Sequence, residues 1–448
     1  MKLRGMNASR FILFFFLVLL FVLAGCSNPQ NILSGNAASS TVVDQGHLVY
    51  TLSNTSLRAF HSKTGTLAWS QDSPDSSVYQ EILVTKTTVY ALRDHKLYTF
   101  DASSGKSGWS QPIDSPSSDS SISNIAVDNW GVYVAANGIA FSFDAKTGNL
   151  QWRTTIQAPE TAGVTTSLAS PKPVIVVQNG VLYTNDDAPV AVVALQSTTG
   201  KQLWSAGIPD DTPRTQGGLQ AVYNLLWHNG MLYAITNYDI AALNIHQGSI
   251  LWQKVLGTGS FATGIIIGSF TIEDTTMMLT TTNFDGSQGG AYQLQLSTGT
   301  MTPLNLPSGV LDFGDGYHNG VAYMVTGPTS GDLIAAQVSN GTTLWNKEGT
   351  GHISYFSVVG ENVYIVRDDG VIMLLDGKNG KPLWSKTLQQ GQGKNIQTDE
   401  NAIYSANNGQ LLALDVHTGS TLWTASTHGN KTDIQSRLNA PLVFMSSN

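Results

Sequence analysis

Few residues of this 448-residue chain have types and spacing that could do covalent or metal chemistry. Cys26 is the only cysteine, so neither an internal disulfide nor a cysteine-cluster metal site can form. The sequence contains no Gly-x-Ser-x-Gly elbow, no His-Glu-x-x-His pair and no phosphate-binding loop. One thiol remains as a candidate for chemistry, and its position near the amino terminus determines which chemistry it could do.

Cys26 ends a segment that is typical of an export signal. Lys2, Arg4 and Arg10 precede an apolar run over residues 11–23, which is shorter than the roughly 20 residues that span a bilayer. Residues 23–26, Leu-Ala-Gly-Cys, resemble the lipobox of bacterial lipoproteins. The resemblance implies cleavage before Cys26 and a thioether from its thiol to diacylglycerol, whose two acyl chains suffice for anchoring. The alternative is an uncleaved signal-anchor helix with an incidental cysteine.

These features divide the chain into three parts. We expect a lipoprotein signal peptide over residues 1–25, a flexible tether over residues 26–40 and a folded body over residues 41–448. The tether is rich in Ser, Asn, Gly and Ala and carries no charge. We therefore expect a cell-envelope protein, lipid-anchored on the extracytoplasmic side of a bacterial membrane.

The composition indicates a globular body and excludes one class of partner. The chain is 41% hydrophobic, which can support a core. Its 23 basic and 31 acidic residues give a formal charge of −8, and loss of the three basic residues among the first 25 would make it −11. Because such a surface repels phosphate backbones, we expect no nucleic-acid partner.

The body consists of one repeated unit. The spacing Gly-x-x-x-Trp recurs at intervals of 39 to 52 residues, about 44 on average, which is the period of a β-propeller blade. A ninth copy, at Gly299, has Pro303 in place of Trp. The eight complete copies are Gly65/Trp69, Gly105/Trp109, Gly148/Trp152, Gly200/Trp204, Gly248/Trp252, Gly341/Trp345, Gly380/Trp384 and Gly419/Trp423.

Each copy has the pattern of a four-stranded antiparallel blade. Residues 89–92 and 97–100 alternate with period two around a polar turn, as the strands of a hairpin do. The Trp would lie on a short outer strand, and preceding residues such as 122–127 and 354–359 would supply an inner strand. Residues 441–445 form a strand-like run after the last Trp and could close the ring at its edge.

The repeated residues have structural roles that explain their types. The Gly is expected to adopt a positive φ, and the Trp to bury its ring against the next blade while its indole N–H meets a carbonyl. Acidic residues four positions before the Gly can accept the N–H groups of the turn. Metal binding by these carboxylates is disfavoured, because the repeat spreads them around a ring, and ligand stacking on the Trp rings is the minor alternative. The residues are Asp101, Asp144, Asp376 and Asp415, with Asn244 in the equivalent place.

The motif resembles the repeat of the pyrroloquinoline-quinone-like β-propeller family, also called quinoprotein alcohol dehydrogenase-like. The resemblance covers residues 41 to about 430 and implies an all-β fold, a single propeller whose blades usually number eight, whereas the repeat count gives nine. Members include quinone-dependent dehydrogenases, lipoproteins of outer-membrane protein assembly and sensor ectodomains. The clearest copies are Leu97–Trp109, Phe141–Trp152, Leu374–Trp384 and Leu412–Trp423.

The sequence favours a non-catalytic protein-binding scaffold, similar to the outer-membrane assembly lipoproteins. The dehydrogenases of the family use adjacent cysteines and a Ca²⁺ site, which this chain lacks in sequence, so we expect no catalytic residue, no cofactor and no metal site. A ligand- or glycan-binding sensor is the alternative, and a dehydrogenase is less favoured. Departures from the repeat include acidic loops at 185–187 and 209–211, and Asp312, Asp315 and His318 as a weak candidate ion site.

Overall fold

The computed structural model describes residues 48–444, with gaps. The residues left out are 53–54, 76, 115–121, 158–172, 188–189, 210–220, 237, 257–264, 284–287, 305–309, 313–315, 327–330, 349, 389–395, 400, 408–409 and 428–441. The expected signal peptide, Cys26 and the tether therefore lie outside the described residues. Among those described, strands and turns make up the regular structure, and none forms a helix capable of crossing a membrane.

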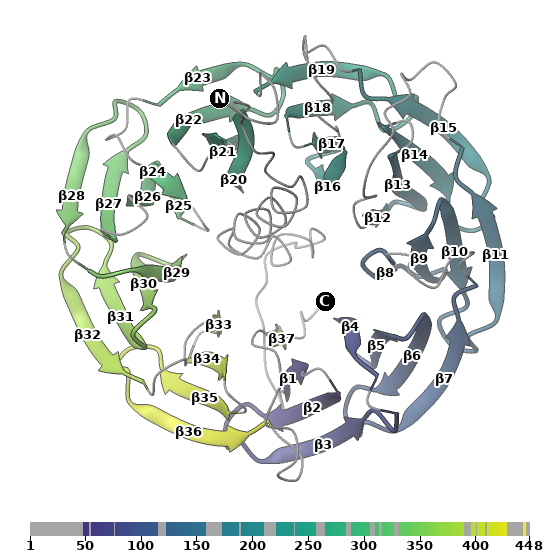
Figure 1. Ribbon diagram of the computed structural model, residues 1–448, viewed down its shortest axis with the longest axis horizontal. Coiled ribbons are helices and arrows are strands. Elements are labelled where there is room, and N and C mark those ends of the chain that lie inside the picture. Colours follow the sequence, from purple (N-terminus) through teal and green to yellow (C-terminus); the bar gives the residue numbers. More distant parts are fainter. Residues whose placement is uncertain are drawn as a thin grey trace, which may run out of the picture.

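The strands form nine antiparallel sheets that are arranged as the blades of one ring (Figure 1). The all-β propeller prediction is confirmed, and the count is nine, as the repeat indicated, rather than the eight usual in the family. Within blades 2 to 9 the strands run in sequence order from the centre outwards, whereas blade 1 has the last strand of the chain innermost. The outermost strands follow one another around the circumference.

Blades 1 to 5 contain the following strands. Blade 1 has β37 (Leu442–Phe444), β1 (Leu48–Leu52), β2 (Ser56–His61) and β3 (Leu67–Asp72). Blade 2 has β4 (Tyr79–Val84), β5 (Thr88–Arg93), β6 (Lys96–Asp101) and β7 (Ser107–Pro112). Blade 3 has β8 (Ala126–Val127), β9 (Val132–Ala136), β10 (Ile139–Phe143) and β11 (Leu150–Thr155). Blade 4 has β12 (Ile175–Gln178), β13 (Val181–Asp187), β14 (Val190–Gln196) and β15 (Gln202–Gly207). Blade 5 has β16 (Val222–His228), β17 (Met231–Thr236), β18 (Asp239–Leu243) and β19 (Ile250–Val255).

Blades 6 to 9 complete the ring. Blade 6 has β20 (Ile265–Glu273), β21 (Thr276–Asn283), β22 (Gln288–Gln295) and β23 (Met301–Pro303). Blade 7 divides its inner strand into β24 (Val310–Asp312) and β25 (Tyr317–His318), followed by β26 (Val321–Thr326), β27 (Asp332–Gln337) and β28 (Thr343–Lys347). Blade 8 has β29 (Ile353–Val359), β30 (Asn362–Arg367), β31 (Val371–Asp376) and β32 (Pro382–Thr387). Blade 9 has β33 (Ile396–Thr398), β34 (Ala402–Asn407), β35 (Gln410–Asp415) and β36 (Thr421–Ser426).

The two ends of the described chain meet in blade 1. β37 pairs antiparallel with β1, with Val443 opposite Tyr50, so the carboxyl-terminal run closes the ring as the sequence predicted. This pairing covers the inner edge of β1, which would otherwise present unpaired backbone groups.

The hydrophobic core is divided into nine layers, one between each pair of neighbouring blades. The layer between blades 1 and 2, for example, contains Tyr50 and Trp69 from one blade and Val89 and Phe100 from the other. The layer between blades 9 and 1 contains Trp423 and Phe60. Because the blades are packed on both faces, central strands such as β9 and β10 are buried along their whole length.

Two details of the sequence prediction are corrected. Residues 185–187, expected in a loop, continue strand β13, and Asn185 bonds the backbone N–H of Val174 at 2.8 Å. The inner strand of blade 3 is limited to Ala126–Val127, with Ile122 forming an isolated bridge. In both places the local composition does not show how far the neighbouring strand pairs with the backbone of the segment.

Candidate functional site

The repeated Gly and Trp form a contact between blades that we call the interblade lock. The ring of each Trp lies where a Cβ on the Gly of the next blade would stand, 2.4–2.7 Å from a ring atom, so only glycine fits. The indole N–H donates to a carbonyl in the same turn, at 2.7–3.1 Å. The Trp–carbonyl pairs are Trp69–Ala102, Trp109–Ala145, Trp152–Ser197, Trp204–Ile245, Trp252–Leu296, Trp345–Gly377, Trp384–Val416 and Trp423–Ser62.

A tyrosine completes each lock, and the sequence analysis did not include it among the site residues. The Tyr50 and Trp69 ring centroids are 5.8 Å apart, and both side chains donate to the Ala102 carbonyl. Burial raises the pKa of Tyr50 above its ordinary range. The signal that could have identified it is the Tyr that recurs in the second strand. The other pairs are Tyr90–Trp109, Tyr133–Trp152, Tyr183–Trp204, Tyr233–Trp252, Tyr323–Trp345, Tyr364–Trp384 and Tyr404–Trp423.

The joint between blades 6 and 7 lacks the lock. In the eight other blades a β-bulge in the outer strand sets the position of the Trp, whereas β22 and β23 pair without a register shift. Pro303 lies opposite Tyr292, and buried Met278 and Met324 fill the layer instead. The Glu273 carboxylate, 3.3 Å from the His318 ring, adds a surface contact across this joint.

The Asx residues organise the turns between the third and fourth strands. Asp101 accepts from the Ser103 and Ser104 hydroxyls and the Ser104 N–H, and these bonds lower its pKa to about 2. Thr147 lowers the pKa of Asp144 and Thr418 lowers that of Asp415 through the same kind of contacts. Each of these carboxylates accepts hydrogen bonds within its own turn. The residues therefore lie in separate turns around the ring and do not form one site.

The locks place all these turns on one face of the ring, which we call the turn face. Each Trp bonds a carbonyl inside the turn of the next blade, so successive turns must lie at the same level. The turns between first and second strands lie on this face too. In blade 3, Val132 follows such a turn and pairs with Phe143, which precedes the turn between the third and fourth strands. The opposite face carries the turns between second and third strands, and we call it the loop face.

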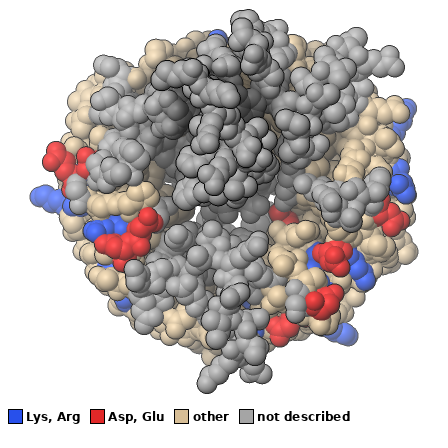
Figure 2. All heavy atoms as spheres, in the orientation of Figure 1, with Lys and Arg blue, Asp and Glu red and all other residues tan. Residues whose placement is uncertain are grey.

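The loop face contains a buried arginine that the sequence analysis did not single out. The Arg93 guanidinium lies 5.2 Å from the Tyr79 ring centroid and 4.4 Å from that of Tyr98, and it donates to the Tyr79 hydroxyl. Figure 2 shows basic and acidic atoms lying beside one another in small groups around the ring. No single sign of charge fills the described part of the face in that view, so it offers no extended field for a charged polymer.

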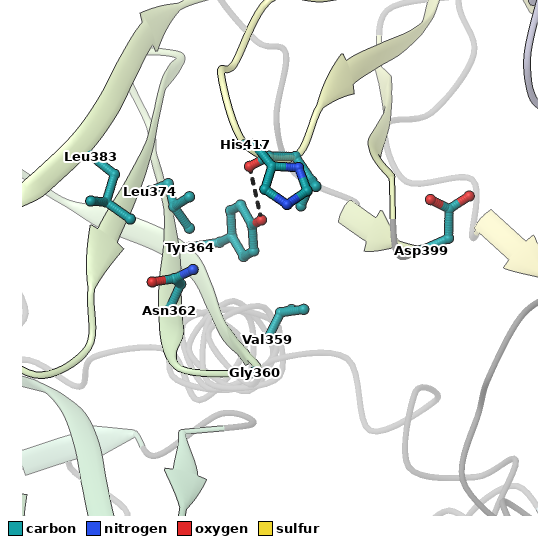
Figure 3. A pocket seen from close by; sticks show the side chains of 9 residues that line it. Val359, Gly360, Asn362, Tyr364, Leu374, Leu383, Asp399 and His417 are labelled. Carbon is teal, nitrogen blue, oxygen red and sulfur yellow. Dashed lines mark hydrogen bonds between the residues drawn. The ribbon is translucent and has the colours of Figure 1, made fainter.

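A small pocket of about 230 Å³ opens on the turn face between blades 8 and 9 (Figure 3). Asn362, Tyr364, Leu383, Asp399 and His417 are among its lining residues. The Tyr364 hydroxyl donates to the Val416 carbonyl at 3.3 Å. The Asp399 carboxylate accepts the N–H groups of Asn401 and Ala402 and the Tyr404 hydroxyl. Because these polar groups already hold the blades and turns, the pocket is suited to a small apolar group.

The candidate ion site is not assembled in the described part of the chain. Asp312 ends β24 and His318 lies in β25 beside Glu273, while Asp315 is outside the described residues. The described residues include no group of three or more His, Cys, Asp or Glu side chains that could hold a metal ion. The calcium-and-quinone site of the family's dehydrogenases therefore has no fitting donor set among them.

The comparisons with known proteins agree with this architecture. A family model described as outer membrane protein assembly factor BamB matches residues 30–160 and 318–445, leaving all the strands of blades 4 to 6 unmatched. Among curated proteins, no sequence matches the chain significantly.

Three solved structures illustrate the fold. BamB from Moraxella catarrhalis is 15% identical, with 82% of this chain and 90% of that chain covered and a TM-score of 0.45. Apo AztD from Citrobacter koseri is 10% identical, with 90% and 98% covered and a TM-score of 0.50. The dihydro-heme d1 dehydrogenase NirN, in complex with DHE, is 11% identical, with 91% and 77% covered and a TM-score of 0.52. At such identities the likeness to AztD and NirN shows the fold alone. Because the family model matches more than half of its residues, the chain belongs to the BamB-type family of pyrroloquinoline-quinone-like β-propellers.

Proposed function

We propose that this protein is a bacterial envelope lipoprotein whose propeller is a non-catalytic scaffold for another extracytoplasmic protein. The family's description as an outer membrane protein assembly factor is the observation that carries this proposal. The proposal adds that Cys26 holds the lipid and that the ring lies on the extracytoplasmic side of the membrane.

The interblade locks support a scaffold role. Eight joints have the same Trp, Gly and Tyr contacts, so the ring is a rigid frame that presents loops and turns in fixed positions. Among the described residues, conspicuous titratable groups such as Asp101 and Asp399 are bonded within their own turns. A rigid surface with satisfied polar groups is suited to binding a partner with little loss of conformational entropy.

A small-molecule sensor is the second candidate, and the pocket between blades 8 and 9 favours it. This pocket is smaller than the usual ligand site, and its carboxylate is already bonded. Any small apolar group would fit it as well as a free ligand would, so the pocket does not by itself require a sensor.

Purification of the acylated full chain in detergent, after crosslinking in cells, tests the scaffold proposal. We expect a stoichiometric envelope protein to co-purify and then to bind purified residues 26–448 in the absence of other components. Addition of quinone and Ca²⁺ should give neither stoichiometric binding by calorimetry nor alcohol-dependent dye reduction. Dye reduction that depends on alcohol, quinone and this protein would replace the scaffold proposal with a dehydrogenase.

A further inference from the structure

The apolar side chains that remain exposed are unevenly distributed between the two faces. Among the described residues, ten large apolar side chains are strongly exposed. Val78 directly precedes inner strand β4 and Tyr223 is the second residue of inner strand β16, and the first residues of inner strands lie at the loop face. The other eight lie at the turn face: Trp130 in a turn, and Leu67, Leu150, Leu203, Leu251, Leu344, Leu383 and Leu422 at or next to the first residue of an outer strand.

Trp130 is the most exposed of them, at 59%, and its backbone is held firmly. The Asp128 carboxylate accepts the N–H groups of Trp130 and Gly131 at 2.8 and 3.0 Å and the Tyr133 hydroxyl at 2.8 Å. The Gln151 side chain donates to the Trp130 carbonyl at 3.1 Å. The indole ring is thus displayed in water by a turn that is fixed from two strands, and it loses little backbone entropy on binding.

Blade 9 shows that the turn does not need a tryptophan. Asp399 accepts the N–H groups of Asn401 and Ala402 and the Tyr404 hydroxyl, which repeats the bonds made by Asp128. Asn401 occupies the position equivalent to Trp130. Since an asparagine serves the same turn, folding does not account for the exposed indole.

The chain enters the ring at the same face. Leu48, the first described residue, pairs with His61, where the turn His61–Gly65 begins. Residues 27–47 join this point to Cys26 and span at most about 75 Å when fully extended. The described chain therefore begins at the turn face, within reach of a membrane-held Cys26.

The charges on the turn face indicate which lipid chemistry it would suit. Its turns carry acidic residues such as Asp101, Asp144 and Asp415 together with lysines such as Lys106 and Lys146. Glu361 and Lys378 form a salt bridge there. Because both signs alternate around the ring, electrostatic attraction to anionic headgroups is not what would hold this face to a bilayer.

We propose that the turn face lies against the bilayer that holds the Cys26 anchor, with the Trp130 indole in the headgroup region. Tryptophan suits this region because its ring is apolar and its N–H needs a polar partner. The contact of the indole with the headgroups is a second membrane-binding site beside the lipid anchor. Because the tether links the two sites, its length sets the effective concentration of the indole at the membrane. The proposal rests on the proposed lipoprotein anchor, and it orients the ring with its loop face towards the partner.

A chemically attached lipid tests this orientation independently of acylation in cells. Residues 26–448 include every described strand and a single cysteine, so a maleimide lipid can be coupled to Cys26 in phosphatidylcholine vesicles. We expect brominated phosphatidylcholine to quench part of the tryptophan fluorescence. Trp130→Asn should reduce quenching to the level seen without bromine and leave the thermal midpoint unchanged. Part-replacement by anionic lipid should not increase the quenching.

A tryptophan on the other face provides the matched control. Val78→Trp in the Trp130→Asn background places an indole at the loop face, where we expect no quenching by brominated lipid. Equal quenching of that indole, or undiminished quenching after Trp130→Asn alone, would overturn the orientation. Dimerisation by light scattering that depends on Trp130, without lipid quenching, would assign the turn face to a second copy of the chain instead. Failure of acylation in cells would count against the anchor alone.

Discussion

Trp423 in the last blade donates its indole N–H to the carbonyl of Ser62 in the first blade, at 2.7 Å and across 361 residues of chain. Its ring also lies against Gly65. The ring of blades is therefore closed by a side-chain lock at its periphery and by the pairing of β37 with β1 near its centre. Closure uses the same contact that joins the other locked blades, which makes the first and last blades neighbours like any other pair.

Trp423→Ala should weaken this closure substantially. Trp423 is 9% exposed, and loss of a buried Trp ring costs about 3–5 kcal/mol. Urea unfolding should show a lower midpoint, and hydrogen exchange should show earlier opening of β1 and β36 than of the strands opposite. Trp384→Ala is the control for a lock within the ring, with a similar loss of stability but no selective opening of blade 1. An unchanged midpoint for both variants would contradict the lock.

Gly105→Ala and Gly138→Ala separate backbone strain from steric overlap. Both glycines have φ of +68°, but a Cβ at Gly105 would lie 2.5 Å from the Trp69 ring, whereas one at Gly138 meets nothing within 4 Å. We expect Gly138→Ala to cost about 1–2 kcal/mol through its left-handed backbone. Gly105→Ala should cost a further amount of about 1–3 kcal/mol through overpacking. Equal losses in denaturant unfolding would show that the Trp69 ring moves away freely.

Pro303→Ala should change stability much less than Trp252→Ala in the preceding joint. Pro303 lies at the end of a three-residue outer strand that has no bulge and makes no lock, so its removal takes little from the layer between blades 6 and 7. Trp252 donates to the Leu296 carbonyl at 3.1 Å and packs on Gly299. Comparable losses of thermal midpoint would mean that blade 6 has a contact that the residues described here do not account for.

Much of the fold could be predicted because the repeat encodes it residue by residue. The Gly at each turn needs a positive φ and room for the Trp ring, so the spacing of Gly65 and Trp69 recurs wherever a blade does. The repeat count therefore gave nine blades. The missing bulge of blade 6 could not be read from the sequence, where Pro303 replaces the Trp and the second strand lacks its Tyr, because a register shift alters pairing and not composition.

The functional surface was less predictable. The repeat spacing separates Trp130 from motif residues such as Trp423, but it does not show that Trp130 is exposed. Trp130 is exposed because it precedes the second strand of its blade, whereas Trp423 is buried because it faces a glycine. Trp227, the other Trp outside the motif, lies on inner strand β16 and packs on the core. Asn185 is polar but buried between blades 4 and 5, where its amide bonds backbone groups, so hydrophilicity alone wrongly placed it in a loop.

The turn carboxylates predict how stability depends on pH. The pKa of Asp101 is about 2 in the folded state, below its ordinary value of 3.8, and those of Asp144 and Asp415 are also lowered. A lowered folded-state pKa stabilises the protein above the unfolded pKa, and this contribution is lost as pH falls from about 4 to about 2. Thermal midpoints should therefore fall across that range.

The triple variant Asp101→Asn, Asp144→Asn and Asp415→Asn is the control for that pH range. Asn244 makes the same bonds to turn N–H groups in blade 5, so asparagine preserves the turn without the titration. We expect the midpoint of the variant to change less between pH 4 and pH 2 than that of the wild type. The same slope in both proteins would assign the acid sensitivity to other carboxylates.

Cys26→Ser tests the proposed anchor directly. A serine hydroxyl at this position cannot form the thioether that fixes diacylglycerol, and processing that follows this step should stop with it. We expect labelled fatty acid to be absent from the variant and the precursor to accumulate at its full length. The propeller begins at Leu48, 22 positions beyond Cys26, so its thermal midpoint should stay the same, which separates loss of the anchor from loss of the fold. Acyl labelling and processing of the variant at the wild-type level would show that Cys26 is not the attachment point.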